Sequence, residues 1–126
     1  MARYLLDTNV LIWEMEGRRL SKDVRRIVEG DATRYISTAS LWEIAVKASL
    51  GKLHPLTAEW MDRLLDAGFL VLPIQFAHLE RVRTLPWLHR DPFDRMLVAQ
   101  ALADELILIT GDRRLLHGYG VATIAA

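Results

Sequence analysis

The sequence contains no cysteine. This absence excludes disulfides, zinc sites that use thiolates and cysteine nucleophiles, but it leaves metal sites made of oxygen ligands open. The chain also lacks an apolar run of about 18 residues, the length that a membrane-spanning helix needs. Its first apolar run is interrupted by Asp7, which is not typical of a secretory signal peptide. We therefore expect a cytoplasmic protein that does not enter a membrane.

Net charge is also absent, because sixteen basic and sixteen acidic residues cancel. This balance argues against a strongly basic nucleic-acid-binding module, although it does not exclude a local basic patch or binding through a metal. The length of 126 residues is enough for one domain with a hydrophobic core and too short for two. No repeat, low-complexity tract or linker divides the chain. We therefore expect a single domain over residues 1–126.

Short apolar runs alternate with segments that have helical periodicity. The predicted strands cover residues 4–6, 34–37, 69–72, 106–109 and 119–124. The predicted helices cover residues 10–16, 21–28, 39–50, 57–68, 76–82, 91–104 and 113–116. This alternation favours an α/β fold with a central, mostly parallel sheet flanked by helices. The strand segments are continuously apolar, as expected for strands that are covered on both faces.

Four acidic residues each lie near the start of a predicted helix: Asp7, Glu43, Asp94 and Asp112. Parallel strands end at the same edge of a sheet, and ligands bind in the crevice there. Asp7 and Asp112 follow two strands, and the helices of Glu43 and Asp94 begin at that edge, so the four acids should converge. Two bare charges about 4 Å apart interact by about 4 kcal/mol at an effective dielectric of about 20. A cluster of four carboxylates therefore needs a counter-cation.

Each of these acids also has a purely structural interpretation. Asp7 and Asp112 can cap the helices that follow them. Glu43 completes a capping box with Ser40, and it can pair with Lys47 four residues later. Taken singly, each structural role is at least as plausible as a functional one.

The two acids at the start of the predicted helix 91–104 also have structural interpretations. Asp91 precedes a proline and suits the cap position, and Asp94 is favourable beside the positive end of a helix dipole. Capping does not require all four acids to share one edge, however. It also does not explain why Thr8, Asn9 and Thr110 place further polar groups beside them. The combined pattern therefore favours a functional site.

The segments that carry these acids resemble the PIN-domain family of metal-dependent ribonucleases, and within it the VapC-type toxins of toxin–antitoxin pairs. The resemblance covers nearly the whole chain. Its four motifs occur in the family's order, at residues 5–9, 40–47, 91–101 and 110–112. Each motif alone is weak evidence, whereas four in order are strong evidence. Gly111 departs from the pattern, because many relatives carry a side chain there.

The resemblance implies that the four acids are both the catalytic residues and the ligands of Mg²⁺ or Mn²⁺. Ligands that are all carboxylates suit these hard ions. The metal would activate a water to cleave an RNA phosphodiester bond, and Glu43 would bind the ion directly or through water. Thr8, Asn9 and Thr110 would support the acids or contact the substrate.

The same resemblance implies three partners: an RNA substrate, a cognate antitoxin that inhibits the enzyme, and a second copy of the chain in a homodimer. Transfer RNA is the substrate that the family suggests, but messenger or ribosomal RNA is equally compatible with the residues. One alternative is an inactive PIN-like module that binds RNA or protein. Another is a phosphoryl-transfer domain of the haloacid-dehalogenase or receiver type. The dehalogenase motif needs a second aspartate where Asn9 stands, and the receiver's early acid pair and late lysine are missing.

The remaining polar and aromatic residues carry weaker expectations. We predict that Trp42 lies in the core and that three further tryptophans are at least partly buried: Trp13, Trp60 and Trp87. The histidines are expected on the surface or in loops: His54, His78, His89 and His117. Four arginines flank the acidic motifs and suit either phosphate binding or charge balance: Arg90, Arg95, Arg113 and Arg114. The apolar first helix suggests deep burial or a subunit interface.

Overall fold

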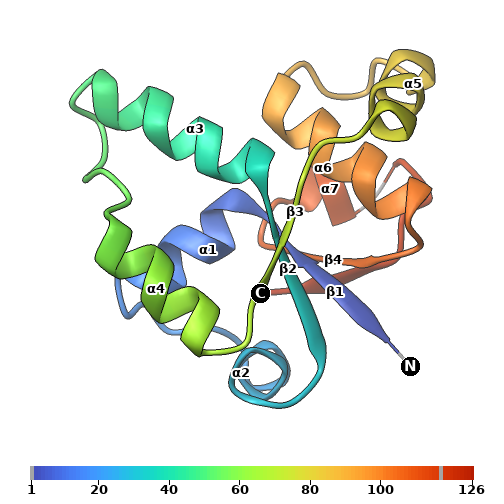
Figure 1. The fold of residues 1–126 in the computed structure, drawn as a ribbon. Coiled ribbons are helices and arrows are strands. Elements are labelled where there is room, and N and C mark those ends of the chain that lie inside the picture. Colours follow the sequence, from blue (N-terminus) through green and yellow to red (C-terminus); the bar gives the residue numbers. More distant parts are fainter. Residues whose placement is uncertain (1, 117) are drawn as a thin grey trace.

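Five parallel strands form one sheet in the order β3-β2-β1-β4-β5 (Figure 1). The computed structural model describes residues 2–116 and 118–126, apart from the side chains at positions 113 and 116. The strands are β1 (Arg3–Leu6), β2 (Thr33–Ser37), β3 (Leu70–Leu72), β4 (Ile107–Thr110) and β5 (Thr123–Ala125). The predicted α/β fold with a central parallel sheet is confirmed.

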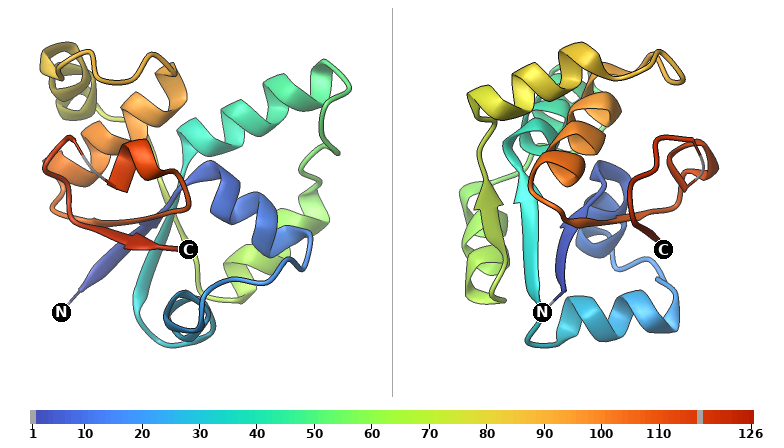
Figure 2. Two further views of the ribbon diagram at one scale, coloured as in Figure 1. Left: turned by 180° about the vertical axis from the view of Figure 1, so that it is seen from behind. Right: turned by 90° about the vertical axis from the view of Figure 1, so that its right-hand side faces the viewer.

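Helices cover both faces of this sheet (Figure 2). They are α1 (Thr8–Met15), α2 (Lys22–Glu29), α3 (Thr38–Ser49), α4 (Ala58–Asp66), α5 (Phe76–Thr84), α6 (Pro92–Ala103) and α7 (Arg113–Leu116). Successive strand residues point to opposite faces, so Leu5 and Leu6 enter two different apolar cores. Leu5 packs with α6, and Leu6 packs with α1, α2 and α4. None of the helices in the described part is long and apolar enough to cross a membrane.

The order of the strands reverses between β1 and β4, which are neighbours in the centre of the sheet. Leu6 pairs with Ile109, and the Asp7 amide continues the ladder by donating to the Ile109 carbonyl at 2.9 Å. Such a switch point leaves a crevice at the carboxyl ends of the strands. The chain therefore places Asp7 directly beside the residues that follow β4.

The predicted caps of three helices are confirmed. The Ser21 and Thr57 hydroxyls accept hydrogen bonds from backbone amides in the first turns of α2 and α4. The Asp91 carboxylate accepts from the amides of Phe93 and Asp94 at the start of α6. These local contacts set where the helices begin, because they satisfy amides that have no partner within the helix.

The capping box predicted for Ser40 and Glu43 is wrong. Helix α3 begins earlier, at Thr38, and its cap is Ser37, whose hydroxyl accepts from the Ala39 amide at 3.0 Å. Ser40 lies inside the helix and accepts a hydrogen bond from the Thr8 hydroxyl at 2.9 Å. Glu43 is therefore free of a capping role.

Two predictions about aromatic side chains are also wrong. Trp42 is 60% exposed and Trp87 is 76% exposed. Trp42 projects away from the sheet because the face of α3 turned inward carries Ala39, Ser40, Glu43 and Ile44 instead. Trp13 and Trp60 are partly buried, as predicted.

The histidines divide into two groups. His54 is exposed and His89 lies in the loop between α5 and α6, as predicted, although His89 is buried. His78 is buried within α5, contrary to the prediction. His78 is buried because polar partners surround it: its ring bonds to the Gln75 amide at 3.0 Å and to the Asp104 carboxylate at 2.9 Å. The prediction for His117 lies outside the described residues.

Arg34 is a buried arginine that ties β2 to two neighbouring segments. Its guanidinium donates hydrogen bonds to the carbonyls of Val28 and Ala32, and to that of Ala67 at 2.7 Å. It also stacks over the Phe69 ring at 4.6 Å. These bonds join the end of α2 to the end of α4.

Replacing Arg34 with methionine should destabilise the protein by about 2–4 kcal/mol, because buried carbonyls that lose their donors cost about 1–3 kcal/mol each. Urea unfolding measures this loss. Arg25→Met is the matched control, since the partly exposed Arg25 pairs with exposed Glu29 and should cost less than about 1 kcal/mol. Equal losses in the two variants would contradict a structural role for the guanidinium of Arg34.

Candidate metal centre

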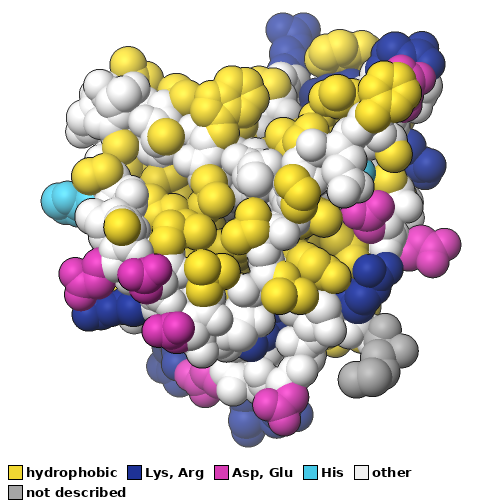
Figure 3. Space-filling view, viewed as in Figure 1, with side chains coloured by type: hydrophobic (Ala, Val, Ile, Leu, Met, Phe, Trp, Pro, Cys, Tyr) yellow, Lys and Arg dark blue, Asp and Glu magenta, His cyan; other side chains and the backbone are white. Residues whose placement is uncertain are grey.

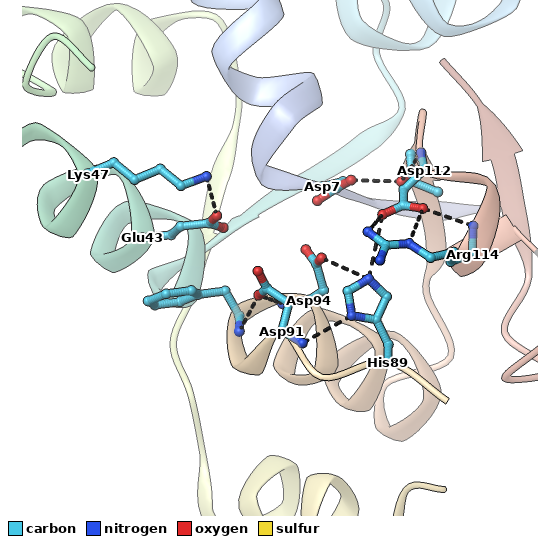
Figure 4. A network of polar contacts seen from close by, with 10 residues as sticks. Asp7, Glu43, Lys47, His89, Asp91, Asp94, Asp112 and Arg114 are labelled. Carbon is cyan, nitrogen blue, oxygen red and sulfur yellow. Dashed lines mark hydrogen bonds and ion pairs between the residues drawn. The ribbon is translucent and has the colours of Figure 1, made fainter. Parts of the chain in front are cut away.

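The four predicted acids come together at the switch point between β1 and β4 (Figure 4). Asp7 follows β1, and Asp112 follows β4. Glu43 projects from the second turn of α3, and Asp94 from the first turn of α6. Two helices and two connections that follow strands thus deliver one carboxylate each, and Figure 4 shows these side chains turned toward a common space.

Asp7 is only 2% exposed. The Thr110 hydroxyl donates to its Oδ2 at 2.7 Å, and the same hydroxyl accepts from the Asp112 amide at 3.0 Å. The other oxygen, Oδ1, is buried and has no hydrogen-bond partner among the described residues. Burial raises the pKa of Asp7, and the bond from Thr110 opposes that rise. Asp7 therefore places in the site a buried carboxylate oxygen that lacks a partner in the described chain.

Glu43 is 4% exposed, and like Asp7 it has, among the described residues, one bonded and one unpaired carboxylate oxygen. Lys47, one turn later on α3, binds Oε2 at 2.8 Å, as the predicted pairing requires. That hydrogen bond raises the pKa of Lys47 and keeps the ammonium charged. The Oε1 oxygen is buried without a partner in the described part of the chain. The contact of Thr8 with Ser40 joins α1 to α3 beside this pair.

Asp94 carries the most perturbed carboxyl group of the site. Burial, followed by the charges of Asp7, Asp91, Glu43 and Asp112, raises its pKa to about 8. At neutral pH and without a cation, this carboxyl group therefore holds a proton. A bound divalent ion would replace that proton.

Asp112 shows the opposite behaviour. The hydrogen bond from Arg114, which binds both of its oxygens at 3.3 and 3.1 Å, lowers the pKa of Asp112. Arg114 thus balances charge in this structure, one of the two roles predicted for the arginines.

The other arginines differ in their surroundings. Arg95 is buried, and its guanidinium donates to the carbonyls of Pro86 and Val82, so it is not available to a phosphate. Arg90 is exposed. The side chain of Arg113 lies outside what the structure describes.

His89 belongs to the site although the sequence analysis gave it no role. It is 6% exposed, and its Nε2 lies 3.4 Å from Asp94 Oδ2 and 3.6 Å from Asp112 Oδ2. Its position two residues before the cap Asp91 was the available signal, because a loop that enters a helix at the sheet edge must pass the site. Asn9 is exposed, and within the described chain it makes no hydrogen bond to the four acids. A substrate contact remains the prediction for Asn9.

The site fits a hard divalent cation. Two buried carboxylate oxygens have no partner in the described chain, and the convergent acids offer oxygen ligands, which Mg²⁺ and Mn²⁺ prefer. Ligand atoms of His89, Asp94 and Asp112 also lie within 4.8 Å of one another. The excess of negative charge would be relieved by such an ion.

A family model described as PIN domain matches residues 4–120. The chain belongs to the PIN domain family. No curated protein matches the sequence. The predicted resemblance is thus confirmed at the level of the family, and the four acids lie within the matched part of this PIN domain.

Solved structures with the same fold include toxin–antitoxin complexes. A DNA-bound VapBC complex from Salmonella typhimurium aligns with a TM-score of 0.68 at 17% identity, over 99% of this chain and 98% of that chain. VapBC2 from Rickettsia felis, bound to a promoter fragment, gives 0.71 at 15% identity, over 97% of each chain. A toxin–antitoxin complex from Klebsiella pneumoniae gives 0.68 at 23% identity, over 96% and 95%. At these identities the likeness concerns the fold.

A side chain at position 111 has no room in this PIN domain. A Cβ at position 111 would lie 2.7 Å from the Cη2 atom of the Trp13 ring. The half-buried indole of α1 therefore occupies the space that a side chain would need. Trp13 covers the turn between β4 and Asp112.

The raised pKa of Asp94 predicts that the metal-free protein loses stability as the pH rises. The folded state binds a proton at Asp94 up to about pH 8, whereas the unfolded chain releases it near 3.8. Between these values the folded state holds more protons, so unfolding becomes easier with increasing pH. Thermal unfolding in EDTA from pH 5 to 8 measures this slope.

Asp94→Asn should reduce the slope and stabilise the metal-free protein at pH 8, because the asparagine cannot ionise. Asp62→Asn, which changes an exposed aspartate of α4, should leave the slope unchanged. The same slope in wild type and Asp94→Asn would contradict the raised pKa.

Proposed function

We propose that this PIN domain is a Mg²⁺- or Mn²⁺-dependent endoribonuclease and the toxin of a toxin–antitoxin pair. The observation that carries the proposal is the convergence of Asp7, Glu43, Asp94 and Asp112, with two buried carboxylate oxygens left without a partner in the described chain. An inactive RNA- or protein-binding module has no need for such a cluster, since unbalanced buried charges cost stability.

The four acids would hold the ion, with Glu43 binding it directly or through water. A bound divalent ion supplies an acidified water and neutralises charge that develops on the phosphate. Thr110 holds Asp7 in place from β4, and Lys47 holds Glu43 from within α3. Asp94 releases its proton when the cation binds, so binding should strengthen as the pH rises toward 8.

The partners follow from the proposed toxin role. Transfer RNA is the proposed substrate class, and an antitoxin is the proposed inhibitor, as the complexes of similar fold are toxin–antitoxin pairs. A basic side chain of the antitoxin that entered the acidic site would compete with the metal. The proposed location is the cytoplasm, where RNA is available.

Asp7→Asn and Asp94→Asn should each abolish RNA cleavage, with a loss of at least about 100-fold, because each removes a charged ligand of the metal. The assay incubates total cellular RNA with purified, antitoxin-free protein in Mg²⁺, Mn²⁺ or EDTA, and sequencing of the fragment ends identifies the target. Asp62→Asn is the matched control and should cleave like wild type.

Circular dichroism shows whether the inactive variants are folded. Full activity in a folded Asp7→Asn or Asp94→Asn protein would contradict the assignment of these acids. A folded wild-type protein that binds Mn²⁺ without cutting any cellular RNA would favour the inactive binding module.

We also propose a homodimer, and the exposed apolar side chains around α3, β3 and α5 support it (Figure 3). A groove of about 460 Å³ lies there, and its lining includes the exposed rings of Trp42 and Trp87 and the ring of Phe93 from α6. Trp42 and Phe93 pack edge to face at 4.9 Å. Large contiguous apolar patches on a protein surface mark interaction sites.

Trp87→Ser should weaken dimerisation at least about tenfold, because exposed tryptophans at the centre of an interface dominate its binding energy. Sedimentation velocity over a range of concentrations measures this change. Leu50→Ser removes an exposed leucine at the end of α3, outside the groove, and should leave the dimer intact. A monomeric wild-type protein would disprove the homodimer.

A further inference from the structure

His89 is a buried histidine for which the proposed mechanism has no role. It lies in the loop between α5 and α6, and its imidazole reaches into the acidic site beside Asp94 and Asp112 (Figure 4). Its Nε2 atom is buried, and it makes no hydrogen bond of normal geometry in the described chain. A buried polar atom in this state, directed at two carboxylates, calls for an explanation.

The other ring nitrogen determines where the proton of the neutral imidazole lies. The Asp91 amide donates a hydrogen bond to His89 Nδ1 at 3.1 Å, so Nδ1 must present a lone pair. A neutral imidazole carries one N–H, and that N–H is therefore at Nε2. The tautomer is thus set by a backbone amide next to the cap of α6.

This tautomer argues against His89 as a metal ligand. A ligating nitrogen presents its lone pair to the ion, whereas Nε2 here presents a hydrogen. The grouping of His89 with Asp94 and Asp112 within 4.8 Å is therefore better explained by a hydrogen-bond donor that faces two acceptors.

The two acceptors come from different parts of the chain. Asp94 Oδ2, on α6, lies 3.4 Å from Nε2, and Asp112 Oδ2, after β4, lies 3.6 Å from it. These distances are longer than those of strong hydrogen bonds, so small movements of either carboxylate would complete the contact. Asp7 and Glu43 already have donors of their own in Thr110 and Lys47.

We propose that His89 is a positioning residue that directs its Nε2–H at Asp94 and Asp112 and thereby sets the spacing of these two carboxylates for the metal. This inference rests on the proposed metal-dependent function. The donor turns one oxygen of each acid toward the imidazole, and it would reduce the repulsion between the two groups once the cation has displaced the proton of Asp94. Partners that orient metal ligands in this way typically contribute about 10–100-fold to metal affinity or activity.

Two substitutions distinguish the positioning of the carboxylates by Nε2 from the hydrogen bond that Nδ1 accepts within the loop. The amide nitrogen of glutamine can occupy the place of Nε2, so His89→Gln keeps a donor for the carboxylates and loses the acceptor for the Asp91 amide. The side-chain oxygen of asparagine can occupy the place of Nδ1, so His89→Asn keeps that acceptor and loses the donor. The two variants therefore have opposite defects.

Binding of Mn²⁺, measured by calorimetry, is the first readout, and RNA cleavage is the second. We expect His89→Gln to bind Mn²⁺ within about threefold of wild type and His89→Asn to bind about 10–100-fold more weakly. Thermal unfolding in EDTA reports the loop contact separately, and the larger loss of stability should occur in His89→Gln. Long-range ¹H–¹⁵N NMR of the wild-type protein should show the Nε2–H tautomer.

Equal Mn²⁺ affinities in the two variants, beside a wild-type protein that binds the ion and cleaves RNA, would overturn only the role of His89. Binding that is weakened equally in both variants would identify His89 as a metal ligand and would overturn the positioning role. An Nδ1–H tautomer in the wild-type protein would overturn that role as well. A wild-type protein that neither binds Mn²⁺ nor cleaves RNA would defeat the proposed function itself, and the positioning role with it.

Discussion

Repulsion among buried carboxylates is the constraint on which the site depends. Asp7 and Glu43 are almost completely buried, and Asp94 keeps a proton up to about pH 8 because of its burial and its acidic neighbours. A protein gains no stability from such an arrangement, since each charge that leaves water carries a desolvation cost. The proposed cation would balance the cluster, and its binding would then be coupled to the release of the proton of Asp94.

The fold tolerates this cluster by giving three of the four acids a hydrogen-bonding partner each. Thr110 holds Asp7, Lys47 holds Glu43, and Arg114 holds Asp112. Each of these partners occupies some of the lone pairs and leaves others free. The remaining acid, Asp94, has a pKa raised to about 8 and faces His89. The arrangement thus combines rigid carboxylates with unsatisfied oxygens, which is what a metal centre requires before the metal arrives.

The parallel sheet explains why the four acids meet. They lie far apart in the chain, but the strand order reverses between β1 and β4, and both strands end at the same edge. Helix α6 leads into β4 and runs antiparallel to it, so the N-terminus of the helix lies at the edge where β4 ends. Asp94, in the first turn of α6, is therefore close to Asp7. The apolar groove lined by Trp42, Trp87 and Phe93 adjoins the helices that carry Glu43 and Asp94. The proposed dimer interface and the proposed metal site are therefore close to each other.

The sequence by itself determined the local features: the first four strands, the helix caps at Ser21, Thr57 and Asp91, and the four acids. The last strand is shorter and later than predicted, at Thr123–Ala125 instead of residues 119–124. Apolar periodicity and capping chemistry act over a few residues, so they can be inferred without knowing the fold. Only the tertiary structure decided that Ser37 caps α3, that Trp42 faces solvent and that His89 is buried between Asp94 and Asp112. These outcomes depend on which face of a helix meets the sheet and on contacts between distant segments, and both are set by packing in three dimensions.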